Sequence, residues 1–201
     1  AKQRFDYTPE DCMAFHDAVE RAVVPAVRTL QRNRQAALGV DPLRPWDLAV
    51  DIQGRPPLRP FATPTELCQK TSRVFGRIDS ELGRQFDQMN DRGYLDLESR
   101  KGKAPGGYQS TYEESRRPFI FMNAVGLQRD VSTLVHEGGH AFHCVAARDE
   151  PLLAYRSSPI EFAEVASMGM EMLALDCLDE FYEGDDLNRA KRNELEGVLE
   201  I

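Results

Sequence analysis

Two histidines and a glutamate occur at a spacing that suits metal-assisted hydrolysis, in the run His136-Glu137-Gly138-Gly139-His140. Residues four apart stand one above the other on the same face of an α-helix, so both imidazoles can bind one Zn²⁺. The glutamate lies beside them and can reach a water on that metal. Because a five-residue match also arises by chance, the pattern needs a suitable helix around it. The residue pattern predicts hydrolysis of a peptide bond by metal-activated water, with Glu137 as the general base.

The residues around this run predict an amphipathic helix. At about 100° per residue, His143 falls on the same side as the two motif histidines. The opposite side is apolar and carries Val131, Leu134, Val135, Gly138, Ala141, Phe142, Val145 and Ala146. Asp130 is the expected N-cap. Gly138 and Gly139 each cost about 1 kcal/mol relative to alanine inside a helix, which predicts the close approach of another backbone. Helix rise places His143 beyond the ion, so it is expected to hydrogen-bond near the site.

A catalytic zinc site usually needs a third protein ligand. No histidine stands at the downstream position that the metzincin pattern requires, so a carboxylate from a second helix, predicted over residues 159–173, is expected instead. Glu164 is the predicted third ligand, and Glu161 is the alternative. Glu171 lies two turns further along the same face and is expected to orient a zinc-bound imidazole through its free N–H. An ordinary ion pair is the alternative role for Glu171.

Residues 119–143 resemble the M3 family of zinc oligopeptidases, which includes the oligoendopeptidase F and thimet oligopeptidase groups. The family signature H-E-x-G-H-x-x-H is met by His136, Glu137, Gly139, His140 and His143. Residues 101–108 resemble its upstream Gly-x-Tyr element, and the overall pattern is closer to the oligoendopeptidase F branch. The resemblance implies Glu164 as third ligand, one Zn²⁺ and a peptide substrate. It also implies a mainly α, zincin-type catalytic segment with a small two- or three-stranded β element beside the active-site helix.

The resemblance further implies tyrosine and histidine groups that bind substrate beyond the third ligand. After Glu171 the chain offers only Tyr182 and no histidine, and it stops within a helix-like run over 187–201. We therefore expect residues 1–201 to be a single fragment of an M3-like catalytic domain. Its helical part is expected at 1–98 and its zinc-site part at 99–201, and the complete substrate site is not expected within this segment.

The composition of the chain argues against some classes of binding partner. The 33 acidic residues outnumber the 25 basic ones and give a net charge of −8, which argues against nucleic acid or an anionic membrane. No apolar run approaches the roughly 20 residues of a membrane-spanning helix. The four cysteines are scattered without a C-x-x-C pair, and we interpret Cys12, Cys68, Cys144 and Cys177 as reduced, mostly buried thiols of a cytoplasmic protein. No pattern indicates the oligomeric state.

Other segments predict the scaffold. A helix is expected between the N-cap Thr8 and Gly39, and a single long amphipathic helix over 67–89. Residues 46–50 are predicted to form a short buried anchor. The charges at 101–103 are expected to lie in a solvated loop.

Strands are expected over residues 108–111 and 119–122. The second is predicted to lie beside the cleft and to pair with an extended peptide, with an ordinary buried strand as the equal alternative. Two other functional classes remain open, a non-catalytic zinc-binding helical segment and a metal-free helical interaction module.

Overall fold

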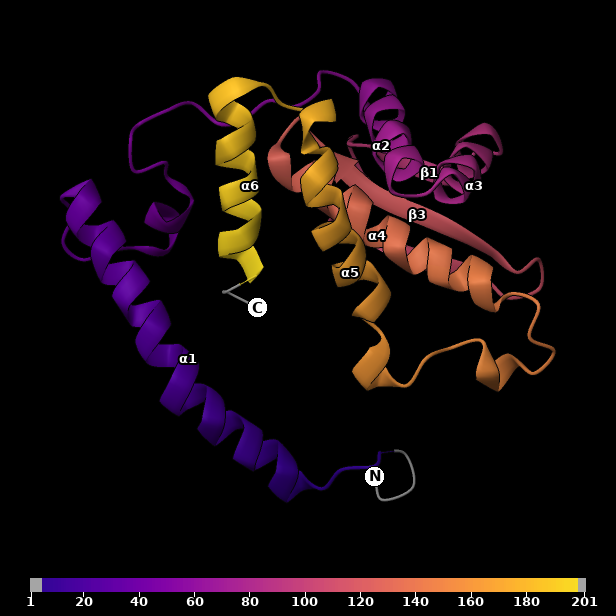
Figure 1. The fold of residues 1–201 in the computed structure, drawn as a ribbon, viewed down its shortest axis with the longest axis horizontal. Helices are drawn as coiled ribbons and strands as arrows, with labels where there is room; N and C mark the ends of the chain where they lie inside the picture. The colour runs from indigo at the N-terminus through magenta and orange to yellow at the C-terminus, as the bar shows by residue number, and fades with distance from the viewer. Residues whose placement is uncertain (1–4, 199–201) are drawn as a thin grey trace. The chain divides into compact units, whose positions relative to one another are not determined.

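The structure, a computed structural model, describes residues 5–198 and is mainly α-helical with one small sheet. Figure 1 shows the arrangement of these elements. The described residues form two compact units, of which Leu58–Glu196 contains all of the predicted site residues. The helices of this unit are α2 (Pro64–Ile78), α3 (Ser80–Asp91), α4 (Gln128–Ala147), α5 (Val165–Ala174) and most of α6 (Gly184–Val198). The last three positions predicted as helix, 199–201, lie outside the described residues.

The first unit is built on α1 (Pro9–Leu38). Its predicted ends are confirmed, because the Thr8 hydroxyl accepts from the backbone N–H of Asp11 and Gly39 adopts φ 65° at the C-cap. The segment after it forms a short 3₁₀ helix, η1 (Pro45–Ala49), in which Trp46 is exposed. The prediction of a buried anchor there is wrong.

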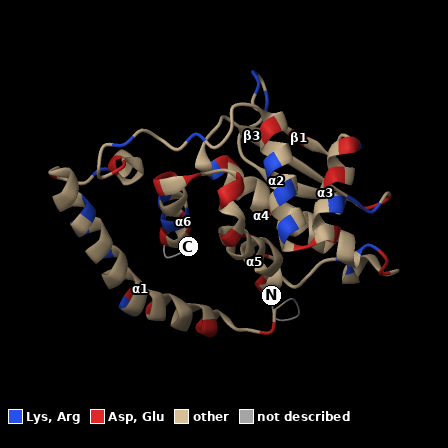
Figure 2. Ribbon diagram, turned by 45° about the horizontal axis from the view of Figure 1, so that its top comes forward, with Lys and Arg blue, Asp and Glu red and all other residues tan. Residues whose placement is uncertain are grey.

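The predicted long helix over 67–89 is two helices, α2 and α3, separated at Asp79. Asp79 has extended backbone (φ −156°, ψ 130°), and its carboxylate accepts from the N–H of Glu81 at 2.7 Å, so it caps the second helix. The apolar spacing continues across this break, which hides it in the sequence. Basic residues recur along α2 in Figure 2, and Arg73 and Arg77 pair with acids of η4 (Leu175–Glu180).

The sheet has the strand order β1-β3-β2, formed by β1 (Leu95–Glu98), β2 (Tyr108–Tyr112) and β3 (Arg117–Ala124). Strands β2 and β3 are the two predicted strands and pair antiparallel, and β1 joins β3 in parallel. Because β3 has a neighbour on both sides, it cannot pair with a peptide, and that prediction is wrong. Strand β2, the hairpin partner of β3, lies at one edge of the sheet.

The loop between β1 and β2 is anchored by a buried lysine. The side chain of Lys103 is only 2% exposed, and Nζ lies within hydrogen-bond distance of the Asp96 carboxylate and the carbonyl oxygens of Glu98 and Met122. It also lies 4.4 Å from the ring centroid of Phe121. The expectation that this charge is solvated is therefore wrong, because backbone carbonyls from two strands replace its water.

Asp96 gives the sheet a predicted acid sensitivity. Hydrogen bonds from Arg100 first and Lys103 second lower the pKa of its carboxyl from 3.8 to about 2. A lowered pKa stabilises the folded state above the unfolded value, and this contribution is lost as pH falls through about 2. With its side chain 26% exposed, Asp96→Asn should lower the free energy of unfolding at pH 6 by at most about 2 kcal/mol. Urea unfolding between pH 6 and 2 should show the difference shrinking, with Asp91→Asn as the exposed control; a pH-independent difference contradicts the assignment.

Helix α4 lies between β3 and α5 in the second unit (Figure 1). The large fully buried side chains around it include Phe75, Phe86, Leu67, Ile120, Met122 and Leu134. Phe75 packs edge-on against both Phe86 and Phe142, with ring centroids 5.1 and 4.8 Å apart, and so joins α2, α3 and α4. Within the described part of the chain, no helix combines the length and the apolar character that crossing a bilayer requires.

Candidate metal centre

Helix α4 presents the histidine motif, and its apolar face is buried as predicted for Val131, Leu134, Val135 and Ala141. Its beginning differs from the prediction. Leu127 holds the N-cap position, and Asp130 is the third helical residue. The Asp130 carboxylate accepts from the N–H groups of Val125 and Leu127 at 2.8 and 2.9 Å, so it closes the turn from inside the helix.

The second carboxylate-bearing segment is shorter than the predicted helix over 159–173. A 3₁₀ turn, η3 (Ile160–Phe162), comes first, and α5 begins only at Val165. Glu164 therefore occupies the N-cap position, with φ −96° and ψ 0°, rather than the interior of a helix. Its carboxylate lies close to the histidines of α4 and is 55% exposed. Glu161 is also exposed, but it lies outside the cluster of candidate ligands.

Two glycines allow the neighbouring elements to approach α4 closely. A Cβ atom on Gly139 would lie 2.6 Å from both Ala166 O and Ser167 Cα, so the predicted approach of another backbone is found here. At Gly138 the neighbour is instead the ring of Phe75, whose Cζ would lie 2.5 Å from an added Cβ. The contact at Gly139 thus sets the distance between the start of α5 and the face of α4 that carries His136 and His140.

The side chains of His136, His140 and Glu164 converge. Their nearest donor atoms all lie within 4.8 Å of one another. Glu164 Oε2 lies 3.1 Å from His136 Nε2 and 3.3 Å from His140 Nε2. The two imidazole planes are inclined by 82°, with centroids 4.9 Å apart. Two nitrogens and one oxygen therefore face a common point.

Separations of this size fit a zinc ion. Two ligands bonded at about 2.0–2.1 Å in tetrahedral geometry lie about 3.3 Å apart, close to the two measured separations. The donor set of two imidazoles and one carboxylate also suits Zn²⁺, and leaves a fourth position for water or substrate. No further protein residue is needed to complete such a centre.

Glu171 fixes the orientation of one imidazole. His136 Nδ1 lies 2.5 Å from Glu171 Oε1, on the ring edge opposite to the nitrogen that faces Glu164. This hydrogen bond, followed by the charges of Glu171, Glu137 and Glu164, raises the pKa of His136, and burial opposes the change. A carboxylate at Nδ1 keeps the proton there and directs the Nε2 lone pair outward.

Ser167 is a site residue that the sequence reasoning did not single out. Its fully buried hydroxyl lies 2.8 Å from Glu164 Oε2 and 3.0 Å from the Glu164 carbonyl oxygen. This hydrogen bond, above all, lowers the pKa of Glu164, and burial opposes it. A hydroxyl three residues after a carboxylate at a helix start was the available signal, since side chains at that spacing face one another.

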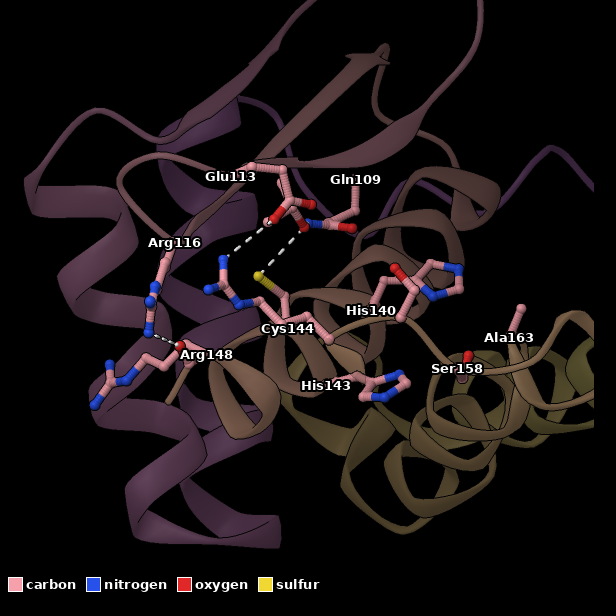
Figure 3. A pocket seen from close by; sticks show the side chains of 12 residues that line it. Gln109, Glu113, Arg116, His140, His143, Cys144, Arg148, Ser158 and Ala163 are labelled. Carbon is pink, nitrogen blue, oxygen red and sulfur yellow. Dashed lines mark hydrogen bonds and ion pairs between the residues drawn. The ribbon is translucent and has the colours of Figure 1, made fainter. Parts of the chain in front are cut away.

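The remaining predicted residues lie around the cluster. Glu137 is 7% exposed on α4, next to His136. His143 is half-buried and lines a cavity of about 250 Å³ together with His140. Figure 3 shows this cavity, with both imidazoles on its wall and Cys144 beside them.

The four thiols are free, but they are less buried than expected. Cys68 and Cys177 are buried, Cys144 is half-buried, and Cys12 is exposed. The Thr111 hydroxyl donates to Cys144 Sγ at 3.3 Å. Burial raises the pKa of Cys144, and the hydrogen bond from Thr111 opposes this effect.

Comparison with known proteins places this geometry in a family. The sequence profile of peptidase family M3 matches residues 1–200. The chain belongs to peptidase family M3. The group B oligopeptidase PepB of Streptococcus agalactiae serotype III (strain NEM316) is a similar M3 relative, 26% identical over 83% of the chain.

Solved structures agree with the M3 assignment. PZ peptidase A with inhibitor 2 superposes with a TM-score of 0.89 at 29% identity. A structure described as an oligoendopeptidase F from Bacillus anthracis str. Ames gives 0.89 at 30%. Each covers 98% of the chain, and the mainly α fold with a small sheet is confirmed. The chain covers 27% of PepB and 34–36% of the two solved chains, so it spans about a quarter to a third of these relatives.

Proposed function

We propose that the polypeptide containing this M3 chain is a zinc metalloendopeptidase that hydrolyses peptide bonds in oligopeptides in the cytoplasm. The observation that carries the proposal is the convergence of His136, His140 and Glu164, whose donor atoms lie within 4.8 Å of one another. These three residues are the proposed ligands of one Zn²⁺. The names of the relatives support the peptide substrate, and the free thiols support a reducing compartment.

Each side chain then has a distinct task. Zinc bound at these residues supplies a Lewis acid that polarises the scissile carbonyl and lowers the pKa of water. Glu137 accepts the water proton and returns it to the departing amine, because it lies on α4 beside the ligands without belonging to their cluster. Glu171 holds the His136 ring, and His143 hydrogen-bonds near the site from the cavity wall.

Strand β2 is the proposed partner of an extended substrate, in place of β3. As an edge strand it has unpaired backbone groups on one side, and main-chain hydrogen bonds there would hold a peptide with little regard to its side chains. Its residues Gln109 and Thr111 line the same cavity as His140, so a peptide along this edge would pass the metal ligands.

Metal analysis tests the ligand set without depending on turnover. Wild-type polypeptide dialysed against one equivalent of zinc should retain about one ion per chain, measured by plasma mass spectrometry. His140→Ala and Glu164→Gln should each weaken zinc binding by more than about 100-fold, since loss of a group that only orients a ligand already costs about 10–100-fold. Glu161→Gln is the matched control and should retain the metal.

The outcomes separate the functional classes. A wild-type protein without zinc would reject the ligand set and favour a metal-free interaction module. Zinc binding without peptide hydrolysis by the full-length polypeptide would favour a non-catalytic zinc-binding segment. Loss of zinc from Glu161→Gln but not from Glu164→Gln would assign the third ligand to the other glutamate.

A further inference from the structure

The cavity beside His140 carries an excess of positive charge. Three arginines line it, Arg116, Arg148 and Arg156, and Glu113 is the only carboxylate among its lining residues. The contrast with the chain as a whole is sharp, because the net charge of the sequence is −8. A recess with one sign of charge and low-dielectric walls concentrates ligands of the opposite sign.

Arg156 is held in place by the backbone and is poorly neutralised. Its side chain is 14% exposed. Nε donates to the Glu150 carbonyl at 2.9 Å, and Nη2 donates to the Pro151 carbonyl at 3.3 Å. The remaining nitrogen, Nη1, lies 3.7 Å from Glu113 Oε2, which is too far for a hydrogen bond. A fixed guanidinium whose Nη1 makes only this long ion pair can exchange Glu113 for a substrate carboxylate at little further cost in side-chain entropy.

Arg116 approaches the same turn from the β2–β3 hairpin. Its backbone adopts φ 54°, a conformation that non-glycine residues rarely take, and its Nη1 donates to the Arg148 carbonyl at 2.8 Å. Figure 3 shows Arg116 and Arg148 on the opposite side of the pocket from His140, with Cys144 and His143 between them. Capping of the Arg148 carbonyl at the end of α4 accounts for the hydrogen bond from Arg116, and Arg156 holds the carbonyls of the loop that follows. These backbone contacts do not account for Nη1 of Arg156, which has only the 3.7 Å ion pair with Glu113.

We propose that this cavity binds a carboxylate of the peptide substrate and makes the enzyme prefer an acidic group near the scissile bond. The inference rests on the proposed peptidase function. Arg148 follows His140 by eight residues, about 12 Å along a helix. An extended peptide covers that distance in about three to four residues. The preferred acidic group is therefore expected about three to four residues from the scissile bond rather than next to it.

Quenched fluorescent peptides test the preference in the full-length polypeptide. The peptides share one sequence and differ only by Glu or Gln at a single position within four residues of the scissile bond, each with a C-terminal amide. A parallel set with a free C-terminus, shortened stepwise, separates a terminal carboxylate from a side-chain carboxylate. At one of these positions, the kcat/KM of the wild-type enzyme should be about tenfold higher for Glu than for Gln, the size of one charge-assisted hydrogen bond.

Variants assign the preference to the cavity. Arg156→Gln and Arg116→Gln should each reduce the ratio toward about one, and Arg156→Lys should restore part of it. Glu113→Gln removes the competing carboxylate and should raise the ratio. Arg92→Gln, an exposed arginine at the end of α3 that does not line the cavity, should leave it unchanged. Because the ratio compares two substrates on one enzyme preparation, a partly misfolded variant still reports it.

Failure of the inference differs from failure of the proposed function. If the wild-type enzyme cleaves none of the peptides, the peptidase assignment itself is wrong. Cleavage with equal rates for Glu and Gln at every position, and no preference for a free C-terminus, would overturn the carboxylate site. So would a preference that survives in both Arg156→Gln and Arg116→Gln, since the arginines would then serve only to hold the end of α4 and the loop after it.

Discussion

Replacing Glu137 by glutamine should lower kcat/KM for peptide hydrolysis by about 10²–10⁴-fold, the usual contribution of a general base. Glutamine keeps the volume of this buried side chain but cannot accept a proton from water. The ligands are untouched, so zinc content should stay at about one ion per chain. Measurements with a quenched peptide and by metal analysis on the same preparation separate the two quantities.

Glu161→Gln is the matched control for this result. It makes the same chemical change on the exposed 3₁₀ turn before Glu164, and it should retain wild-type activity. Equal rates for the wild-type enzyme and Glu137→Gln would end the proposed role of Glu137. Loss of zinc from Glu137→Gln would instead mean that the residue supports the metal.

The second large effect is expected at the contact between α4 and α5. In Gly139→Ala the new methyl group would lie 2.6 Å from backbone atoms of Ala166 and Ser167, which have no rotamer by which to yield. The helices must separate, and such overpacking costs about 1–3 kcal/mol or more. Since α5 carries Glu171 and has Glu164 at its N-cap, zinc affinity and activity should fall with the free energy of unfolding.

Two further glycines provide the comparison for this substitution. An added Cβ on Gly169, within α5, would meet nothing within 4 Å, so Gly169→Ala should be stabilising by up to about 1 kcal/mol. Gly138→Ala meets the side chain of Phe75 rather than a backbone, and an intermediate loss of stability is expected. Thermal unfolding with and without zinc ranks the three glycine variants by stability. If Gly139→Ala is no worse than Gly169→Ala, the close approach does not position the ligands.

Local patterns in the sequence predicted the parts of the fold that local chemistry decides. Thr8 and Gly39 bound a helix because their own side chain and backbone satisfy its ends. The break at Asp79 was missed because the apolar residues keep helical spacing on both sides of it. The cap by Asp79 is a local signal for the turn, and helices α2 and α3 then pack closely, because an added Cβ on Gly83 would lie 2.7 Å from Gly76 Cα.

Features that depend on distant segments were beyond a local pattern. Strand β1 pairs in parallel with β3, so its partner lies some 25 residues away and no turn sequence announces it. Without β1 in the prediction, β3 is expected to be an edge strand of the sheet. Lys103 looks like a loop charge because the carbonyl oxygens that surround it come from other elements.

The residues of the candidate metal centre also differ in whether local sequence predicts them. The spacing of His136 and His140 follows from helix geometry alone and could be predicted. The structure places Glu164 near the two histidines, but the prediction of this residue assumes a continuous helix that the structure does not contain. Arg156 could not be predicted, since its role depends on loop carbonyls and on a cavity that form only in the folded chain.

Cys144 gives the molecule a natural reporter of what enters the cavity. Of the four thiols it is the half-buried one, whereas Cys12 is exposed and Cys68 and Cys177 are buried. Alkylation followed by peptide mass mapping distinguishes these classes by rate, without any introduced label. A compound seated between the hairpin and the end of α4 would shield this sulfur while the exposed Cys12 continued to react, so occupancy could be read by footprinting even in a catalytically dead variant.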